Sequence, residues 1–229
     1  KTLSYFAPEL AGNNLKIKIS GNMSGYVDDF NFSDIRINSE NGTFRGKTSG
    51  RLRGLPEIED TYVDARLDNF AFTTRGLENF ISEWMTGGKK LDIDGFAEGS
   101  VFSLNARGRG MMNAIDLKTK VTSAIGNADA EVKLSNIVSK ARPIEISGTV
   151  QTEDLDLGKI IYNDILGPTS LRANLNANLG NEKIPMEVKI DTMKVNRLHA
   201  NGYDYSGITA IGKISPNGFD GSITCNEPN

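Results

Sequence analysis

Few residues of the chain have side chains suited to catalysis or to binding a metal ion. His199 is the only histidine and Cys225 is the only cysteine among 229 residues. A histidine-based acid–base pair or metal site would have only carboxylates as helpers, and one cysteine excludes an intramolecular disulfide or a Cys-based zinc site. His199 lies between an expected strand and a turn, and Cys225 lies on an alternating segment. We therefore predict a surface histidine and a small, buried thiol.

Other polar segments have the residue types of binding sites without the required spacing. Asp92 and Asp94, and the acidic residues in 57–60, resemble parts of calcium sites but lack the remaining ligands of an EF-hand loop. Gly-rich segments at 108–110 and 51–54 contain arginine, yet no phosphate-binding Gly-x-Gly-x-x-Gly pattern opens a helix after either. We therefore predict that the chain is not an enzyme, requires no cofactor and holds no metal.

Charge and hydropathy exclude two further classes of protein. The chain has 26 basic and 29 acidic residues, a net charge of −3 and a pI near 5.4, so it lacks the basic excess of a nucleic-acid-binding protein. Its apolar runs are about three residues long, so we expect no transmembrane helix. The sequence starts without a signal-like segment, and we expect it to be part of a longer protein.

Hydrophobic residues recur with a period of two along most of the chain. The clearest examples are residues 15–19, 128–134, 171–179 and 184–190, where apolar and polar side chains alternate. This alternation gives each strand one apolar and one polar face, which is typical of antiparallel sheets. We predict an all-β fold of about a dozen or more strands, forming an elongated, curled, mainly antiparallel sheet. The 38% hydrophobic content fits such strands, because every second residue faces water.

Two short segments have helical spacing instead, so we expect one or two short helices. In the first, Gly76 precedes the helix and Gly87-Gly88 ends it; in the second, residues 157–166, Gly167-Pro168 stops it. The first could be an amphipathic membrane-surface helix or a cap on the sheet end. We favour the cap, because its polar face carries glutamate and no Lys or Arg. Its apolar residues are Leu77, Phe80, Ile81 and Trp84.

An apolar-x-x-apolar-x-apolar pattern recurs along the sequence. Its copies start near residues 27, 67, 112, 152 and 190, at separations of 40, 45, 40 and 38 residues, and the copy at 152 is degenerate. A period between 20 and 50 residues indicates an array of repeated units. We predict that residues 1–229 form a single elongated domain of repeats about 40 residues long. The three-residue step breaks the alternation and predicts a bulge or bend.

The recurring order of alternating apolar residues, glycines and a short helix resembles the TamB and AsmA-like family of bacterial envelope proteins, in particular a Bacteroidetes-type TamB. The resemblance is carried by residues 30–55, by 67–80 and by 148–167, and it extends over about residues 15–215. It implies a periplasmic segment of a protein anchored in the inner membrane, with a sheet folded into a trough, the β-taco. It also implies intermembrane phospholipid transport or outer-membrane protein assembly, with an outer-membrane β-barrel partner bound through parts outside this chain.

The trough implied by the resemblance would present its apolar face to phospholipid acyl chains. Burying each CH2 group of an acyl chain contributes about 0.8 kcal/mol to its binding. The acyl chain therefore gains enough free energy to leave water without polar contacts to the protein. An alternative is a structural or adhesive β-solenoid of the cell envelope with a fully packed interior, and a third is an enzyme acting on envelope glycans. The same side chains suit a groove or a core. The predicted groove residues are Ile17, Ile19, Phe30, Phe32, Val63, Leu67, Phe70, Phe72, Leu91, Ile93, Leu104, Ile115, Leu117, Val132, Ile144, Ile146, Leu175, Met186, Val188, Ile190 and Val195.

Overall fold

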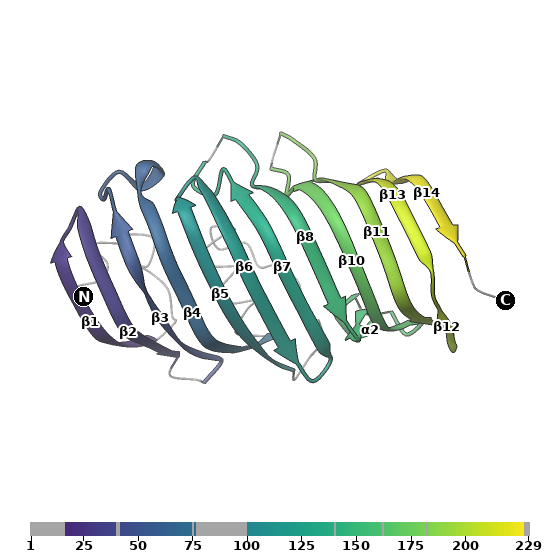
Figure 1. Ribbon diagram of the computed structural model, residues 1–229, viewed down its shortest axis with the longest axis horizontal. Helices are drawn as coiled ribbons and strands as arrows, with labels where there is room; N and C mark the ends of the chain where they lie inside the picture. Colours follow the sequence, from purple (N-terminus) through teal and green to yellow (C-terminus); the bar gives the residue numbers. More distant parts are fainter. Residues whose placement is uncertain are drawn as a thin grey trace.

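A computed structural model of the chain describes residues 17–39, 42–74, 76, 100–139, 141–161, 163–181 and 183–226. These residues form one large antiparallel sheet in which nearly every strand pairs with its neighbours in sequence. Figure 1 shows the strands side by side in chain order, with β1 at one end of an elongated sheet and β14 at the other. The predicted all-β, mainly antiparallel fold is therefore confirmed.

The strands of the first half begin at residue 17 and end at residue 135. They are β1 (Ile17–Tyr26), β2 (Asp29–Ser39), β3 (Phe44–Arg53), β4 (Tyr62–Thr73), β5 (Val101–Met111), β6 (Ala114–Ser123) and β7 (Gly126–Ser135). A short 3-10 helix, η3 (Ile58–Asp60), lies between β3 and β4.

The second half continues the same sheet with two short side strands. Its strands are β8 (Glu145–Glu153), β9 (Leu155–Asp156), β10 (Leu166–Asn178), β11 (Glu187–Ala200), β12 (Tyr203–Tyr205), β13 (Ile208–Ser215) and β14 (Gly218–Cys225). The short strand β9 pairs with β10, and β12 pairs with β11. The helix α2 (Leu157–Ile161) confirms a helix in the predicted second segment, but it is shorter than predicted. Gly167 and Pro168 lie within β10, where Pro168 pairs with Asp156 of β9.

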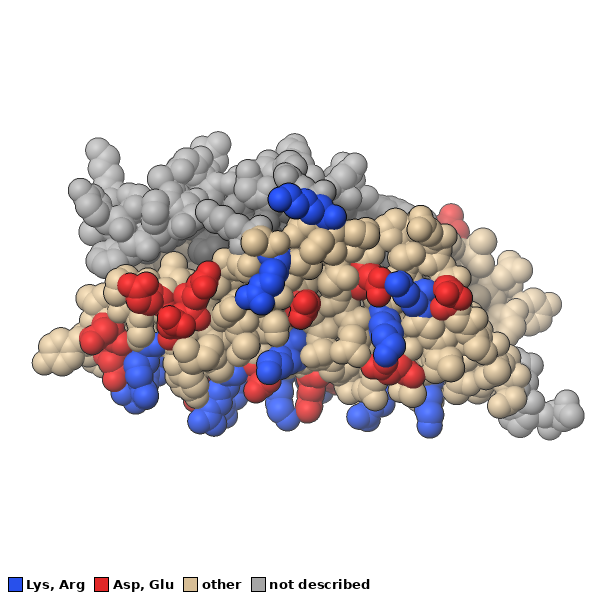
Figure 2. Space-filling model, turned by 90° about the horizontal axis from the view of Figure 1, so that it is seen from above, with Lys and Arg blue, Asp and Glu red and all other residues tan. Residues whose placement is uncertain are grey.

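Each strand separates apolar from polar side chains because its residues alternate between the two faces of the sheet. In β6, Ile115 and Leu117 pair in register with Leu134 and Val132 of β7, whereas the intervening Asp116 pairs with Lys133. We name the first side the apolar face and the second the polar face. In Figure 2 many Lys, Arg, Asp and Glu side chains project from one side of the sheet along its length.

Bulges allow residues three positions apart to share the apolar face. The register shifts between Leu67 and Phe70 of β4 and between Ile190 and Met193 of β11, as the repeated pattern predicts. Asn69, in the bulge of β4, has φ of 49°, and its backbone N–H donates a hydrogen bond to Asn105 Oδ1 over 3.0 Å. The other copies lie elsewhere: those starting at 27 and 112 begin in hairpin turns, and the copy at 152 spans the break between β8 and β9.

Small residues occupy several positions of one row across the apolar face, where neighbouring backbones come very close. Gly50, Ala65 and Gly108 are paired directly across β3, β4 and β5, and Gly148 of β8 lies in the same row. A side chain on Gly50 would collide with the carbonyl oxygen of Asp64 in β4, and one on Gly148 with the carbonyl oxygen of Glu131 in β7. Neighbouring backbones therefore approach too closely at these positions to leave room for a side chain, as glycines in a curved sheet allow.

Candidate functional site: the apolar face

Most of the predicted groove residues lie together on the apolar face. Their pairing forms continuous rows across the sheet, for example Leu117 with Val132, Leu175 with Ile190, and Ala177 with Val188. The predicted residues that the register places on this face are Ile17, Ile19, Phe30, Phe32, Val63, Leu67, Phe70, Phe72, Leu104, Ile115, Leu117, Val132, Ile146, Leu175, Val188, Ile190 and Val195.

Two predicted groove residues have other positions, and two more are not described. Ile144 lies just before β8, and Met186 lies just before β11 with 47% of its surface exposed. Neither belongs to the paired registers, because the apolar alternation continues past the strand ends. The carbonyl of Ile144 still accepts a hydrogen bond from the Leu179 N–H over 2.9 Å. Leu91 and Ile93 lie outside the described residues, as do Leu77, Phe80, Ile81 and Trp84 of the predicted cap helix.

Burial on the apolar face changes along the sheet. Val63, Ile190 and Val195 are less than a tenth exposed, whereas Leu117 and Val132 are half-buried. Met23 of β1 and Ile223 of β14 are 68% and 63% exposed, because each lies on a terminal strand of the sheet. The apolar face thus combines packed positions with an exposed hydrophobic surface at both ends.

Phenylalanine side chains form a ladder across the apolar face of β3, β4 and β5. The ring centroids of Phe44 and Phe70 lie 6.0 Å apart, and those of Phe72 and Phe102 lie 5.4 Å apart. Stacked aromatic pairs at such distances contribute beyond their buried area. Phe44 and Phe102 were missing from the predicted set although each begins an alternating run, Phe44 before Gly46 and Phe102 before Leu104.

The helix α2 covers one end of the apolar face. Phe102 and Ile125 form a buried cluster there, and Phe72, Val121 and Ile160 pack against it. Since Ile160 belongs to α2, this helix packs on the sheet at that cluster, and it also contacts β10. The sequence predicted a cap helix at residues 77–84, which lie outside the described residues; α2 is a different segment that covers the sheet.

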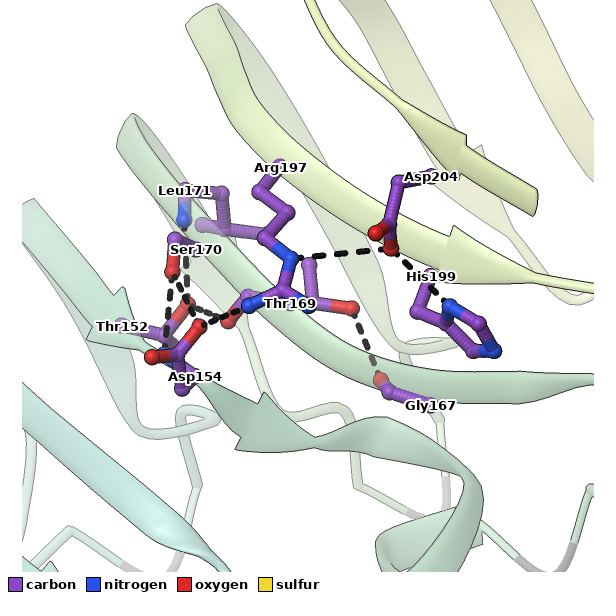
Figure 3. Close-up of polar contacts among 9 residues, drawn as sticks. All are labelled: Thr152, Asp154, Gly167, Thr169, Ser170, Leu171, Arg197, His199 and Asp204. Carbon is purple, nitrogen blue, oxygen red and sulfur yellow. Dashed lines mark hydrogen bonds and ion pairs between the residues drawn. The ribbon is translucent and has the colours of Figure 1, made fainter. Parts of the chain in front are cut away.

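The only histidine lies in a polar network at the ends of β10, β11 and β12. His199 Nδ1 is 2.9 Å from Asp204 Oδ1, and Arg197 Nε lies 3.5 Å from the same oxygen. The histidine is the second-last residue of β11, and 39% of its side chain is exposed, close to the predicted surface position. Figure 3 shows its ring pointing away from Ser170, so no serine–histidine pair forms.

The same network holds the break between β8 and β9 in place. Asp154, with φ of 46°, donates its backbone N–H to Ser170 Oγ over 2.9 Å, and Arg197 Nη1 donates to Asp154 Oδ1 over 3.2 Å. Thr152 Oγ1 donates to the carbonyl of Thr169 over 2.9 Å (Figure 3). These bonds connect β8, β10 and β11 where the strand ladder is interrupted, which is a structural role.

The carboxyl of Asp204 makes this network sensitive to pH. The hydrogen bond with His199, aided by the charge of Arg197, lowers the pKa of Asp204 below its usual value. A carboxyl with a depressed pKa stabilises the fold above the unfolded value of about 3.9, and this contribution is lost as pH falls through the folded pKa. Asp204→Asn should therefore destabilise the protein more at pH 6 than at pH 2.5. Urea unfolding at both pH values checks this, and an equal loss at both would contradict it.

Other sequence candidates have different outcomes. Cys225 is exposed, so the predicted burial of its thiol is wrong; it lies on β14, and no further strand covers that edge within the described residues. Glu57 precedes η3, Glu59 and Asp60 lie within it, and no metal-ligating cluster occurs in the described ranges. Asp92 and Asp94 lie outside them. Arg51, Arg53 and Arg109 lie on the polar faces of β3 and β5.

No helix in the described part of the chain is long and apolar enough to cross a membrane. Comparison with known proteins yielded no matching family model, and neither the curated proteins nor the solved structures gave a match. The site therefore rests on its own geometry: one apolar face that all the main strands of an elongated sheet share.

Proposed function

We propose that the apolar face is a groove for the acyl chains of phospholipids. In this proposal the chain is a periplasmic, TamB/AsmA-like segment that serves phospholipid transport between membranes, outer-membrane protein assembly, or both. The observation that carries the proposal is the unbroken apolar face itself. Within the described residues it spans every main strand from β1 to β14, and no second sheet packs on it.

The dimensions of the sheet suit an extended hydrocarbon chain. Neighbouring strands lie about 4.8 Å apart, so four strands cover roughly 19 Å, which is comparable to an extended acyl chain of sixteen carbons. Rows such as Leu117, Val132, Leu175 and Ile190 run across the strands in this direction, with Gly148 between Val132 and Leu175. Burying a chain along such a row gains about 0.8 kcal/mol for each CH2 group.

Exposed apolar side chains on the terminal strands favour a groove rather than a fully packed interior. A monomer seldom exposes contiguous apolar patches beyond a few hundred Å2 without a binding role. At β1, Ile19 and Met23 are 49% and 68% exposed, and at β14 Phe219 and Ile223 are 43% and 63% exposed. The buried Phe102 and Ile125 cluster supports the packed alternative, but it is confined to the end covered by α2.

Lipid analysis of the purified protein tests this proposal. The chain is expressed in the periplasm of a bacterium, purified without detergent, and examined by native mass spectrometry and by organic extraction. We expect bound phospholipid in an amount comparable to the protein. Protein that is folded by circular dichroism but free of lipid, and that takes up none from vesicles, would support the packed structural or adhesive alternative.

A further inference from the structure

A cluster of arginines occupies the polar face of β3, β4 and β5, on the opposite side of the sheet from the groove. The cluster comprises Arg51, Arg53, Arg66, Arg107 and Arg109. With Tyr62, Asp64 and Ser49 they line an open, shallow pocket of about 500 Å3. All five arginine side chains are between 43% and 66% exposed, so a ligand in solution can reach them.

The central cations of this cluster have like-charged neighbours across the strands. Arg66 of β4 is paired directly with Arg107 of β5, and Arg107 is paired with Lys118 of β6. Like charges directly opposite each other destabilise a sheet. Elsewhere on this face such pairs occur singly, as Lys189 with Lys213, but here three cations follow one another.

The carboxylates within the cluster offset only part of this charge. Asp29 accepts a bidentate pair of hydrogen bonds from Arg51, at 2.7 and 2.5 Å, and lies 3.9 Å from Arg53. Asp64 lies 3.4 Å from Arg107 and 3.8 Å from Arg109. Two carboxylates therefore serve four of the five arginines, and Asp68 serves Arg66, so three carboxylates face five arginines and the pocket keeps a positive surplus.

Aromatic and acidic contacts hold the guanidinium groups in place. Arg109 Nε donates a hydrogen bond to Tyr62 Oη over 2.7 Å, and the guanidinium carbon of Arg53 lies 5.9 Å from the centre of the Tyr62 ring. Arg66 Nε lies 3.2 Å from Asp68 on the same strand. Arginines that are already ordered lose less conformational entropy when they bind an anion.

We propose that this pocket binds a compact, multiply charged phosphate group, such as a phosphomonoester or a pyrophosphate. Guanidinium groups form paired, charge-assisted hydrogen bonds with phosphate oxygens. The cations span only a few strands and end at Asp116 and Glu131 on the β6–β7 side, so they match a compact anion better than a long polyanion. The phosphate can belong to a soluble molecule or to a lipid headgroup.

Two binding measurements at low ionic strength distinguish the source of the phosphate. Calorimetry with inorganic pyrophosphate tests a soluble ligand, and flotation with phosphatidylcholine vesicles containing phosphatidic acid tests a headgroup. Both interactions should weaken as salt is added, because the site is exposed. Binding in either assay supports the proposal only if it depends on the pocket, and binding in neither overturns it.

The double variant Arg107→Gln/Arg109→Gln tests that dependence. We expect it to weaken binding about tenfold or more, since each lost bond to a charged group is a strong one. The control is Lys189→Gln/Lys213→Gln, which removes the same charge from the same face, far from the pocket, and should bind as the unchanged protein does. Equal weakening in both variants would show an effect of net charge only and overturn the site. Acyl-chain retention on the apolar face should be the same in both, so this proposal and the groove can fail separately.

Discussion

The triple variant Phe32→Asp/Leu117→Asp/Val188→Asp should lose bound phospholipid while keeping its β-sheet signal. The three residues lie on the apolar faces of β2, β6 and β11, and each is half-buried. A carboxylate there remains partly hydrated in the empty groove, but an acyl chain lying on it would remove that water at a large cost. We expect more than a tenfold loss of lipid per protein in organic extracts.

A matched variant on the polar face controls for added charge. Asn31→Asp/Ser147→Asp/Ser222→Asp introduces the same three charges at exposed positions of β2, β8 and β14, and it should retain lipid. If the apolar-face variant instead unfolds while the control stays folded, the interior is a packed core and the groove is wrong.

Gly148→Ala should be among the most destabilising single changes in the chain. Gly148 has φ of 143°, and a Cβ atom there would collide with the carbonyl oxygen of Glu131 and come within 2.8 Å of Val132 Cα. Backbone strain and overpacking each cost about 1–3 kcal/mol, so the free energy of unfolding should fall by about 3 kcal/mol or more. Urea unfolding monitored by circular dichroism measures the loss.

Gly218→Ala separates the two causes. Gly218 also has a positive φ, 118°, but a Cβ atom there would meet nothing within 4 Å. Its cost should be backbone strain alone, about 1 kcal/mol. Equal losses in the two variants would contradict the close approach of β7 and β8 at Gly148.

The strands and their faces were predictable because their cause is local. In β6 the alternation of Ile115, Asp116, Leu117 and Lys118 predicts both the strand and which of its side chains lie on the apolar face. The bulge after Leu67 was also visible, since three residues separate it from Phe70. Register alone then places the predicted residues of the paired strands on one face.

Features that depend on contacts between distant segments were not predictable. The repeated pattern has copies in bulges, in turns and at a strand break, because each copy's role depends on the strand paired with it. The exposure of Cys225 follows from its place on the last strand, and the arginine pocket follows from the register of β3 to β5. Arg51 and Arg109, 58 positions apart in sequence, each pair with Asp64 across their strands.

Photocrosslinking at two adjacent positions tests the central claim most directly. A photoreactive amino acid is introduced at Leu117, on the apolar face of β6, or at Lys118, on its polar face, and the protein is illuminated in the periplasm. An acyl-chain groove predicts a covalent phospholipid adduct, detected by mass spectrometry, at position 117 and none at 118. Equal adducts at both positions, or none at 117 in folded protein, would contradict it.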